Sequence, residues 1–225
     1  MNLTPCKINK LNGHYDKAVV KICPVYVFYH IYCGSNDWKG IVDEQLQMMK
    51  ISGLWSEMDK LFVTIIGSDS DIADVMAMLA GTNFEVVYSS DDGSCFEFPC
   101  LIKMRQLAKS EKFYALYFHT KGASYSRIRH DWSSCNYEWK LVQVARWRNL
   151  MNYYCLYKWN MAINALSDNY EAYGILQRDM PKPHFSGNFW WARSELISNT
   201  PVIDRIFKED RYNAEFWIMW GGVIH

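Results

Sequence analysis

The 225-residue sequence has no excess of charge of either sign. Its 24 lysine and arginine residues balance 24 aspartate and glutamate residues, so the formal net charge at pH 7 is zero. A protein that binds nucleic acid through a broad basic surface carries a clear cationic excess. The composition therefore argues against a nucleic-acid partner, although a neutral chain can still contain a local cationic pocket.

Paired cysteines and long apolar runs are also missing. The cysteines are odd in number and include no Cys-x-x-Cys pair, which argues against a disulfide framework or a zinc site. The longest apolar run, 25–33, has the length of a strand. The first 21 residues lack the apolar core of a secretory signal. We therefore expect a cytoplasmic protein with reduced thiols and no transmembrane segment.

The signatures of several enzyme classes are absent. The sequence contains no P-loop, no Gly-x-Gly-x-x-Gly, no Gly-x-Ser-x-Gly elbow and no zinc-deaminase signature. This weighs against a nucleotide-binding or hydrolase-like protein such as a phosphatase or deaminase, which is one alternative. Hydrophobic residues make up 50% of the chain and aromatic residues 16%, which is ample for a substantial core.

Strand-like and helix-like segments alternate through the first half. Apolar, β-branched runs predict strands at 25–32, 60–66, 84–88 and 113–118. Helical periodicity predicts helices at 38–51, 72–79 and 101–110, with Asp71 as the N-cap of the second. Strands that alternate with helices indicate parallel βαβ units in an open α/β sheet.

The second half is less regular. It predicts a long helical region at 137–166, a strand at 185–192, short helices at 194–198 and 202–207, and a helix or structured turn at 213–220. We find no internal repeat or linker. The sequence thus predicts a single Rossmann-like α/β domain over residues 1–225, with a mostly parallel mixed sheet flanked by helices. Residues 1–24 are interpreted as an N-terminal arm.

Polar residues follow each of the four predicted strands, within 30–36, 67–71, 89–93 and 119–124. In an open α/β sheet, ligands bind beyond the carboxyl ends of the strands, so these segments share one rim. Lys121 beside Gly122 offers a diphosphate a point charge and a closely approaching backbone. The candidate donor-binding residues are His30, Asp69, Asp71, His119, Thr120, Lys121 and Gly122.

Structural roles compete with these assignments. His30 lies within an apolar strand, and a hydrogen-bonded core residue is the favoured interpretation. Asp69 and Asp71 fit turn and cap roles as well as they fit ligand binding. The cluster at 119–122 carries more polar groups than a turn requires, which favours function there.

A second mixture of polar, glycine and aromatic residues spans 184–192. An aromatic face covers the C–H side of a pyranose, while amide and hydroxyl groups orient its hydroxyls. Because strand side chains alternate, we expect one of the two tryptophans to face the pocket; a buried aromatic strand is the alternative. The candidate sugar- or acceptor-binding residues are His184, Ser186, Gly187, Asn188, Trp190 and Trp191.

Three segments, YFHTKGAS, HFSGNFWWAR and RYNAEFWI, resemble in order and spacing a family of small GT-A-type glycosyltransferases. Members occur in bacterial surface-polysaccharide clusters and in large DNA viruses. The resemblance covers about residues 25–218 and implies a GT-A-like fold. It implies that residues 25–124 bind a nucleoside diphosphate-sugar and that residues 125–225 bind a glycan acceptor.

The sequence departs from the wider GT-A pattern at one position. Many GT-A enzymes carry Asp-x-Asp after the fourth strand, where it holds a divalent metal, but here that position reads His-Thr-Lys-Gly. The charge of Lys121 in place of a metal predicts metal-independent transfer; a manganese or magnesium ion is the open alternative. The Asp-x-Asp at 69–71 follows the second strand, a position that resembles the nucleoside site.

Glu215 is the candidate catalytic base, paired with Lys121 on the leaving-group side. Inverting transfer requires a base for the acceptor hydroxyl, and the aromatic residues beside Glu215 would raise its pKa. A carboxylate that simply favours a helix N-terminus is the structural alternative. Arg146 and Arg148 either assist the phosphates or form a solvated helix face. A non-catalytic carbohydrate- or nucleotide-binding protein is the second alternative, and donor, acceptor and stereochemistry stay open.

Overall fold

The computed structural model describes residues 21–34, 36–125, 134–205 and 207–220. Most of the predicted arm, and the last five residues, lie outside these ranges. The chain forms a six-stranded mixed sheet with the order β3-β2-β1-β4-β8-β5. Strands β1 to β4 are parallel, and β8 is antiparallel to both β4 and β5. Their bounds are β1 (Val25–Tyr32), β2 (Lys60–Ile66), β3 (Phe84–Ser90), β4 (Tyr114–His119), β5 (Ala172–Gly174) and β8 (Trp190–Arg193).

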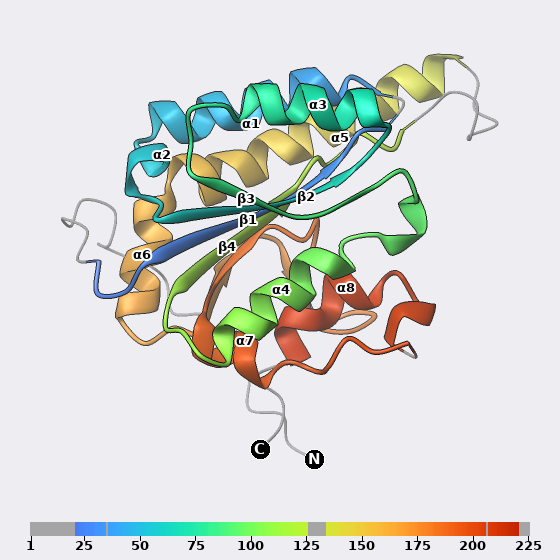
Figure 1. Ribbon diagram of the computed structural model, residues 1–225. Helices are drawn as coiled ribbons and strands as arrows, with labels where there is room; N and C mark the ends of the chain where they lie inside the picture. The colour runs from blue at the N-terminus through green and yellow to red at the C-terminus, as the bar shows by residue number, and fades with distance from the viewer. Residues whose placement is uncertain (1–20, 35, 126–133, 206, 221–225) are drawn as a thin grey trace.

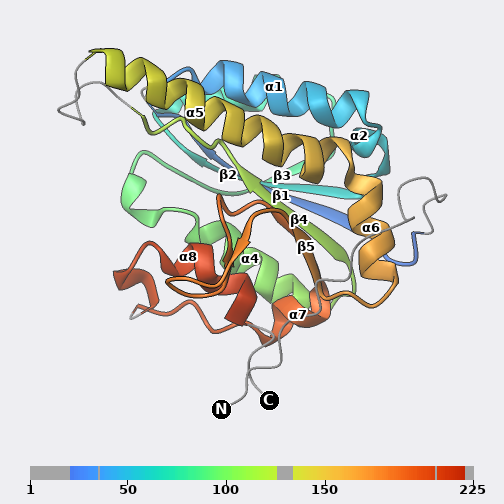
Figure 2. The ribbon, with the colours of Figure 1, turned by 180° about the vertical axis from the view of Figure 1, so that it is seen from behind.

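Helices cover both faces of the sheet (Figures 1 and 2). One face carries α1 (Trp38–Ile51), α2 (Leu54–Glu57), α3 (Asp69–Met78), α5 (Ser134–Asn152) and α6 (Trp159–Ser167). The other carries α4 (Phe98–Ala108), α7 (Ser194–Asn199) and α8 (Asn213–Phe216). The predicted α/β class, with a mixed sheet flanked by helices, is confirmed.

Short elements complete the described chain. A π-helix, η2 (Tyr153–Tyr157), links α5 to α6, and β6 (Gln177–Arg178) pairs with β7 (His184–Phe185). The 3₁₀ turns are η1 (Gly93–Cys95), η3 (Phe207–Glu209) and η4 (Trp217–Trp220). In the described part of the chain, no helix is long and apolar enough to cross a membrane. The thiols of Cys23, Cys33, Cys95, Cys100 and Cys155 are free.

The alternation of side chains along the central strands sorts the core into two layers. In β1, Val27, Tyr29 and Ile31 join the cluster beneath α1 and α5. Tyr26 and Phe28 join the cluster beneath α4, and His30 continues that face by alternation. The registers pair Phe28 with Tyr117 and His30 with His119, so these four residues share the α4 face at the carboxyl ends of β1 and β4.

Several predicted elements differ from the structure, and helix α4 begins at Phe98, ahead of its predicted start at residue 101. Residues 185–192 form no single strand, because a turn separates β7 from β8; Gly187 and Asn188 adopt φ values of 93° and 59° there. The helix predicted at 202–207 is wrong, since residues 202–205 are not helical and η3 begins only at Phe207. Helix α3 begins at Asp69 with Ser68 as its N-cap, so the predicted N-cap at Asp71 is wrong.

Candidate functional site

A pocket of about 490 Å³ lies beyond the carboxyl ends of β1 and β4. The chain runs from β1 to β2 on one side, and after β3 it crosses back to β4 on the other. The pocket therefore occupies the point where the strand order reverses, which is the usual ligand site of an open α/β sheet. Both halves of the chain line it, with His30, Glu97, His119 and Lys121 from the first and Arg211 and Glu215 from the second.

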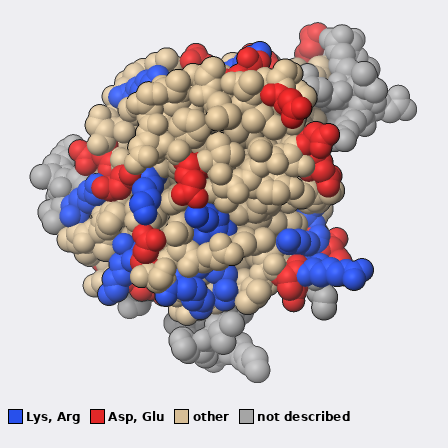
Figure 3. All heavy atoms as spheres, in the orientation of Figure 1, with Lys and Arg blue, Asp and Glu red and all other residues tan. Residues whose placement is uncertain are grey.

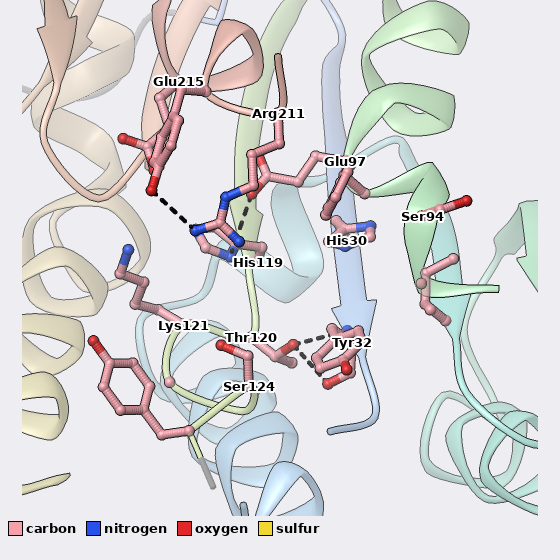
Figure 4. A pocket seen from close by; sticks show the side chains of 16 residues that line it. His30, Tyr32, Ser94, Glu97, His119, Thr120, Lys121, Ser124, Arg211 and Glu215 are labelled. Carbon is pink, nitrogen blue, oxygen red and sulfur yellow. Dashed lines mark hydrogen bonds and ion pairs between the residues drawn. The ribbon is translucent and has the colours of Figure 1, made fainter. Parts of the chain in front are cut away.

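Lys121 and Glu215 line the same pocket, although 93 positions separate them in sequence. Figure 4 shows both side chains reaching toward one space, Lys121 from the loop after β4 and Glu215 from α8. The Lys121 Nζ lies 4.4 Å from the ring centroid of Trp147. Within the described residues it forms no ion pair, so its charge remains available to an anionic ligand.

Hydrogen bonds to α1, α5 and β1 fix residues 119–121. Gln45 donates through Nε2 to the His119 carbonyl at 3.0 Å, and Arg148 donates through Nη1 to the Lys121 carbonyl at 3.1 Å. Thr120 accepts from the Tyr32 N–H at 2.8 Å and donates to the Tyr32 carbonyl at 3.1 Å. Gly122, at φ 99°, continues the turn. The loop that carries Lys121 is thus held in one conformation by its main chain.

Arg148 takes part in a buried cluster, which corrects its interpretation as part of a solvated helix face. It is 8% exposed, and its Nη2 lies 2.9 Å from Oε2 of Glu44. Asn152 donates to Oε1 of Glu44 at 2.6 Å. Arg146, two positions earlier on α5, is exposed. Arg148 therefore supports the loop from behind and does not line the pocket.

Two histidines at the pocket are held neutral. His119 pairs through Nε2 with the carbonyl of Gly187 at 3.0 Å, and His30 pairs through Nδ1 with Oγ1 of Thr64 at 2.8 Å. Burial, followed by the nearby charge of Lys121, lowers the pKa of His119 to about 4. Burial also lowers the pKa of His30 to about 4. His30 is thus both a hydrogen-bonded core residue and part of the pocket wall.

Glu97 is a pocket residue that the sequence did not reveal. Its Oε2 accepts hydrogen bonds from the Tyr117 hydroxyl at 2.8 Å and from Asn188 Nδ2 at 2.7 Å. Its Oε1 lies 3.9 Å from Nδ1 of His119. Glu97 is the N-cap residue of α4, which has a proline in its first turn. Because proline favours the first helical positions, Pro99 was the signal that could have placed this helix start.

Arg211 also lines the pocket and was not predicted. Its guanidinium lies 4.8 Å from the ring centroid of Tyr212, another lining residue.

Lysine, arginine and acidic side chains are interspersed on the face drawn in Figure 3, in agreement with the neutral composition.

None of the predicted sugar-binding residues lines the pocket, although Gly187 and Asn188 bond to the lining residues His119 and Glu97. Trp190 and Trp191 are each 0% exposed, so the expectation that one of them faces the pocket is wrong. They lie on opposite faces of the sheet; Trp190 donates to Asn188 Oδ1 at 2.8 Å and Trp191 donates to the Cys155 carbonyl at 2.8 Å. His184 is buried and bonded to the Lys182 carbonyl, whereas Ser186 is half-buried.

The structure places Asp69 and Asp71 outside this pocket. The Asp71 carboxylate accepts from the N–H of Ser68 at 3.0 Å and from its hydroxyl at 2.7 Å, which closes a capping box at the start of α3. Asp69 lies in the first turn of the same helix. Among the described residues, no group of three or more histidines, cysteines or acids could hold a metal ion.

Comparison with known proteins gives one match. The model of a family described as "Domain of unknown function (DUF8361)" matches residues 28–211, more than half of the chain. No curated protein and no solved structure matches. The matched range contains Glu97, His119, Lys121 and Arg211 of the pocket and ends before Glu215.

Proposed function

The chain belongs to the DUF8361 family, a domain of unknown function, and we propose that it is a glycosyltransferase. It would transfer a sugar from a nucleoside diphosphate-sugar to a hydroxyl of a glycan or other acceptor. One observation carries the proposal: a cation, Lys121, and a carboxylate, Glu215, line one pocket at the reversal point of an α/β sheet.

The donor side of the pocket suits a diphosphate. Lys121 supplies a positive charge from a fixed backbone, and Arg211 offers a second cation at the same wall. A cavity of about 490 Å³ is within the usual range for a small-molecule site. Among the described residues after β4, Lys121 places an ammonium group at this position, and no group of three acids, histidines or cysteines accompanies it, which does not suit a divalent ion. Lys121 would therefore carry the counter-charge itself.

The proposed reaction is a single displacement. The acceptor oxygen forms a bond to the anomeric carbon while the bond from that carbon to the diphosphate oxygen breaks. Glu215 takes the acceptor proton, and the nucleoside diphosphate leaves with the bonding electrons. Lys121 stabilises the negative charge that develops on the leaving group through an oxocarbenium-like transition state. Because a single displacement forms the new bond on the face opposite the one that breaks, it inverts the anomeric carbon.

A donor screen tests the proposal first. Melting temperature is measured with UDP-, GDP- and dTDP-sugars, each with and without manganese. Because a ligand that binds only the folded state stabilises it, at least one donor is expected to raise the melting temperature without metal. No shift with any donor would contradict the function. A strict need for manganese would contradict the role given to Lys121.

Two variants then separate an enzyme from a binding protein. Lys121→Ala is expected to slow hydrolysis of the donor by about 10²- to 10³-fold, the usual loss when one group that stabilises transition-state charge is removed. Glu215→Gln should slow transfer to an acceptor while leaving donor binding intact. Lys109→Ala removes an exposed lysine beyond α4 and is the matched control, with unchanged turnover expected. Full activity in Lys121→Ala would refute the mechanism.

A further inference from the structure

Two hydrogen-bond acceptors face each other at the pocket wall. His119 Nε2 pairs with the Gly187 carbonyl, and because a carbonyl only accepts, the ring proton lies on Nε2. With the ring neutral, its Nδ1 is an acceptor, and the lowered pKa of His119 keeps it so near neutral pH. The nearest oxygen of Glu97 is 3.9 Å away and also accepts. Neither atom supplies a proton for the other.

The carboxylate of Glu97 is fixed by groups behind it. Tyr117 and Asn188 both donate to Oε2, which leaves Oε1 for the pocket. Asn188 is 1% exposed, and its own Oδ1 accepts from the indole of Trp190. Asn188 can place its amide there because the turn at 187–188 has positive φ at both residues. The Ser-Gly-Asn-Phe-Trp segment therefore holds Glu97 in place through Asn188.

Neither acceptor is among the described buried atoms that lack a partner, so water reaches both in the open pocket. A ligand that covers them without donating leaves them unpaired, which costs free energy, whereas a ligand that donates to them avoids this cost. No described group of three acids, histidines or cysteines surrounds the pair, so a metal ion does not explain it. Lys121 lines the same pocket and disfavours a second cation there. Neutral O–H groups remain, and a sugar presents them on adjacent carbons.

We propose that Glu97 and His119 form a subsite that accepts hydrogen bonds from hydroxyl groups of the transferred sugar, with Asn188 as the positioning residue for Glu97. This inference rests on the proposed function and names the part of the donor that the pocket distinguishes. A site built to pair with a hydroxyl rejects analogues that lack it, because the acceptors are then left unpaired. Donor selectivity is therefore assigned to this subsite.

Glu97→Gln tests the subsite by replacing a hydrogen-bond acceptor with a donor. Tyr117 and Asn188 both donate, so the introduced amide must turn its carbonyl toward them and its NH₂ toward His119 Nδ1. The introduced NH₂ then donates to His119 Nδ1, so neither group is left to accept a hydrogen bond from a ligand. We expect an unchanged or higher melting temperature, unchanged binding of UDP, GDP and dTDP, and at least tenfold weaker binding of the nucleotide-sugar that the wild type prefers. Glu85→Gln, at a surface carboxylate paired with Lys103, is the control and should change none of these values.

A fluorinated series makes the test independent of that variant. The preferred nucleotide-sugar is compared with analogues in which the hydroxyl at each ring position is replaced in turn by fluorine, which cannot donate. The wild type should lose about tenfold or more in affinity at one or two adjacent positions, and Glu97→Gln should not distinguish those analogues. Equal affinity of the wild type for every analogue would overturn the subsite.

The remaining outcomes are also decisive. If Glu97→Gln loses nucleotide and nucleotide-sugar binding in equal measure, Glu97 has a general structural role and the inference fails while the proposed function stands. If the wild type binds nucleoside diphosphates but no nucleotide-sugar more tightly, the subsite is refuted. If it binds neither class, the proposed function fails and the subsite with it.

Discussion

Glu44 and Glu97 are two partly buried carboxylates on opposite faces of the sheet, and they are paired in different ways. Asn152 donates to Oε1 of Glu44, and Arg148 donates to Oε2. Glu97 receives both of its hydrogen bonds on Oε2, and its Oε1 faces the pocket. A carboxylate with both oxygens paired stabilises the fold. One with an oxygen unpaired at a cavity has binding capacity left for a ligand.

The cluster around Glu44 still supports the pocket, because its side chains bond to main-chain carbonyls of the loop after β4. Arg148 connects Glu44 to the carbonyl of Lys121, and Gln45 bonds to the carbonyl of His119 and to Asn152. Every polar group that this cluster contributes is satisfied within the protein. The cluster can therefore hold the loop rigid before any ligand arrives, which is what preorganised charge stabilisation requires.

Removing Arg148 should have the largest effect on stability. Arg148→Ala leaves Glu44 and the Lys121 carbonyl without their shared donor, and Glu44 keeps partial access to water. We expect the free energy of unfolding to fall by about 3 kcal/mol, measured by urea denaturation. Arg146→Ala, at an exposed arginine of the same helix, should change it by less than about 0.5 kcal/mol. Equal effects would show that the Glu44 cluster is not the support of the loop.

Acid should destabilise the pocket side selectively. The pKa values of His30 and His119 fall from 6.5 to about 4 on folding, so the unfolded chain binds more protons between these values. The stability they contribute is complete above pH 6.5 and is lost as the pH falls toward 4. Glu97, Lys121 and Glu215 face this pair from α4, the β4 loop and α8.

His119→Asn should remove part of this pH dependence. Between pH 7 and pH 5, the unfolding free energy of the variant is expected to fall by up to about 2 kcal/mol less than that of the wild type. Urea denaturation at half-unit steps from pH 7.5 to 4.5 measures the slope. An identical slope in the variant and the wild type would exclude His119 as the titrating group.

Charge removal at the two carboxylates should have opposite outcomes. Glu44→Gln turns an amide NH₂ toward the donors Arg148 and Asn152, and should cost about 1 to 2 kcal/mol of unfolding free energy. Glu97→Gln should be neutral or stabilising, because its NH₂ meets an acceptor. Thermal denaturation of the two variants side by side compares them directly. A larger loss in Glu97→Gln would reverse our assignment of which carboxylate is structural.

Removing a tyrosine hydroxyl gives the smallest and sharpest contrast. Tyr29 donates to Oε1 of Gln45 behind the loop, and Tyr117 donates to Glu97 in the pocket. Tyr29→Phe and Tyr117→Phe should each cost about 1 kcal/mol of stability. Only Tyr117→Phe should also weaken nucleotide-sugar binding, by a few-fold, because it loosens Glu97. Titration calorimetry distinguishes them, and a matching loss in Tyr29→Phe would contradict the contrast.

The regular elements of the first half were predictable because local patterns determine them. The predicted bounds of β1, α1 and β2 match the structure at both ends. Their apolar periodicity reports burial directly, and turn residues mark their ends. The helix start at Phe98 was missed, although Phe98 and Leu101 have helical spacing and Pro99 marked the first turn.

The Trp-Trp segment shows where local patterns are insufficient. Its aromatic and polar mixture suggested a surface for a sugar ring, but β8 lies between β4 and β5, and both indoles are buried there. Whether an aromatic strand is exposed depends on which strands pair with it and on which helices cover each face of the sheet, and both are long-range properties. The same mixture of residues therefore fits a segment that holds Glu97 in place as well as it fits a surface that binds a sugar ring.

The sequence by itself determined the alternation of strands and helices and the rim of polar residues that ends in Lys121 and Gly122, because side-chain periodicity and backbone propensity act over a few residues. Only the tertiary structure decided that Glu97 meets His119 and Asn188, and that Lys121 and Glu215 line one cavity. These contacts join residues from distant parts of the chain. They exist because strand order and sheet pairing, which no local pattern encodes, bring the carboxyl ends of β1 and β4 beside α4 and α8.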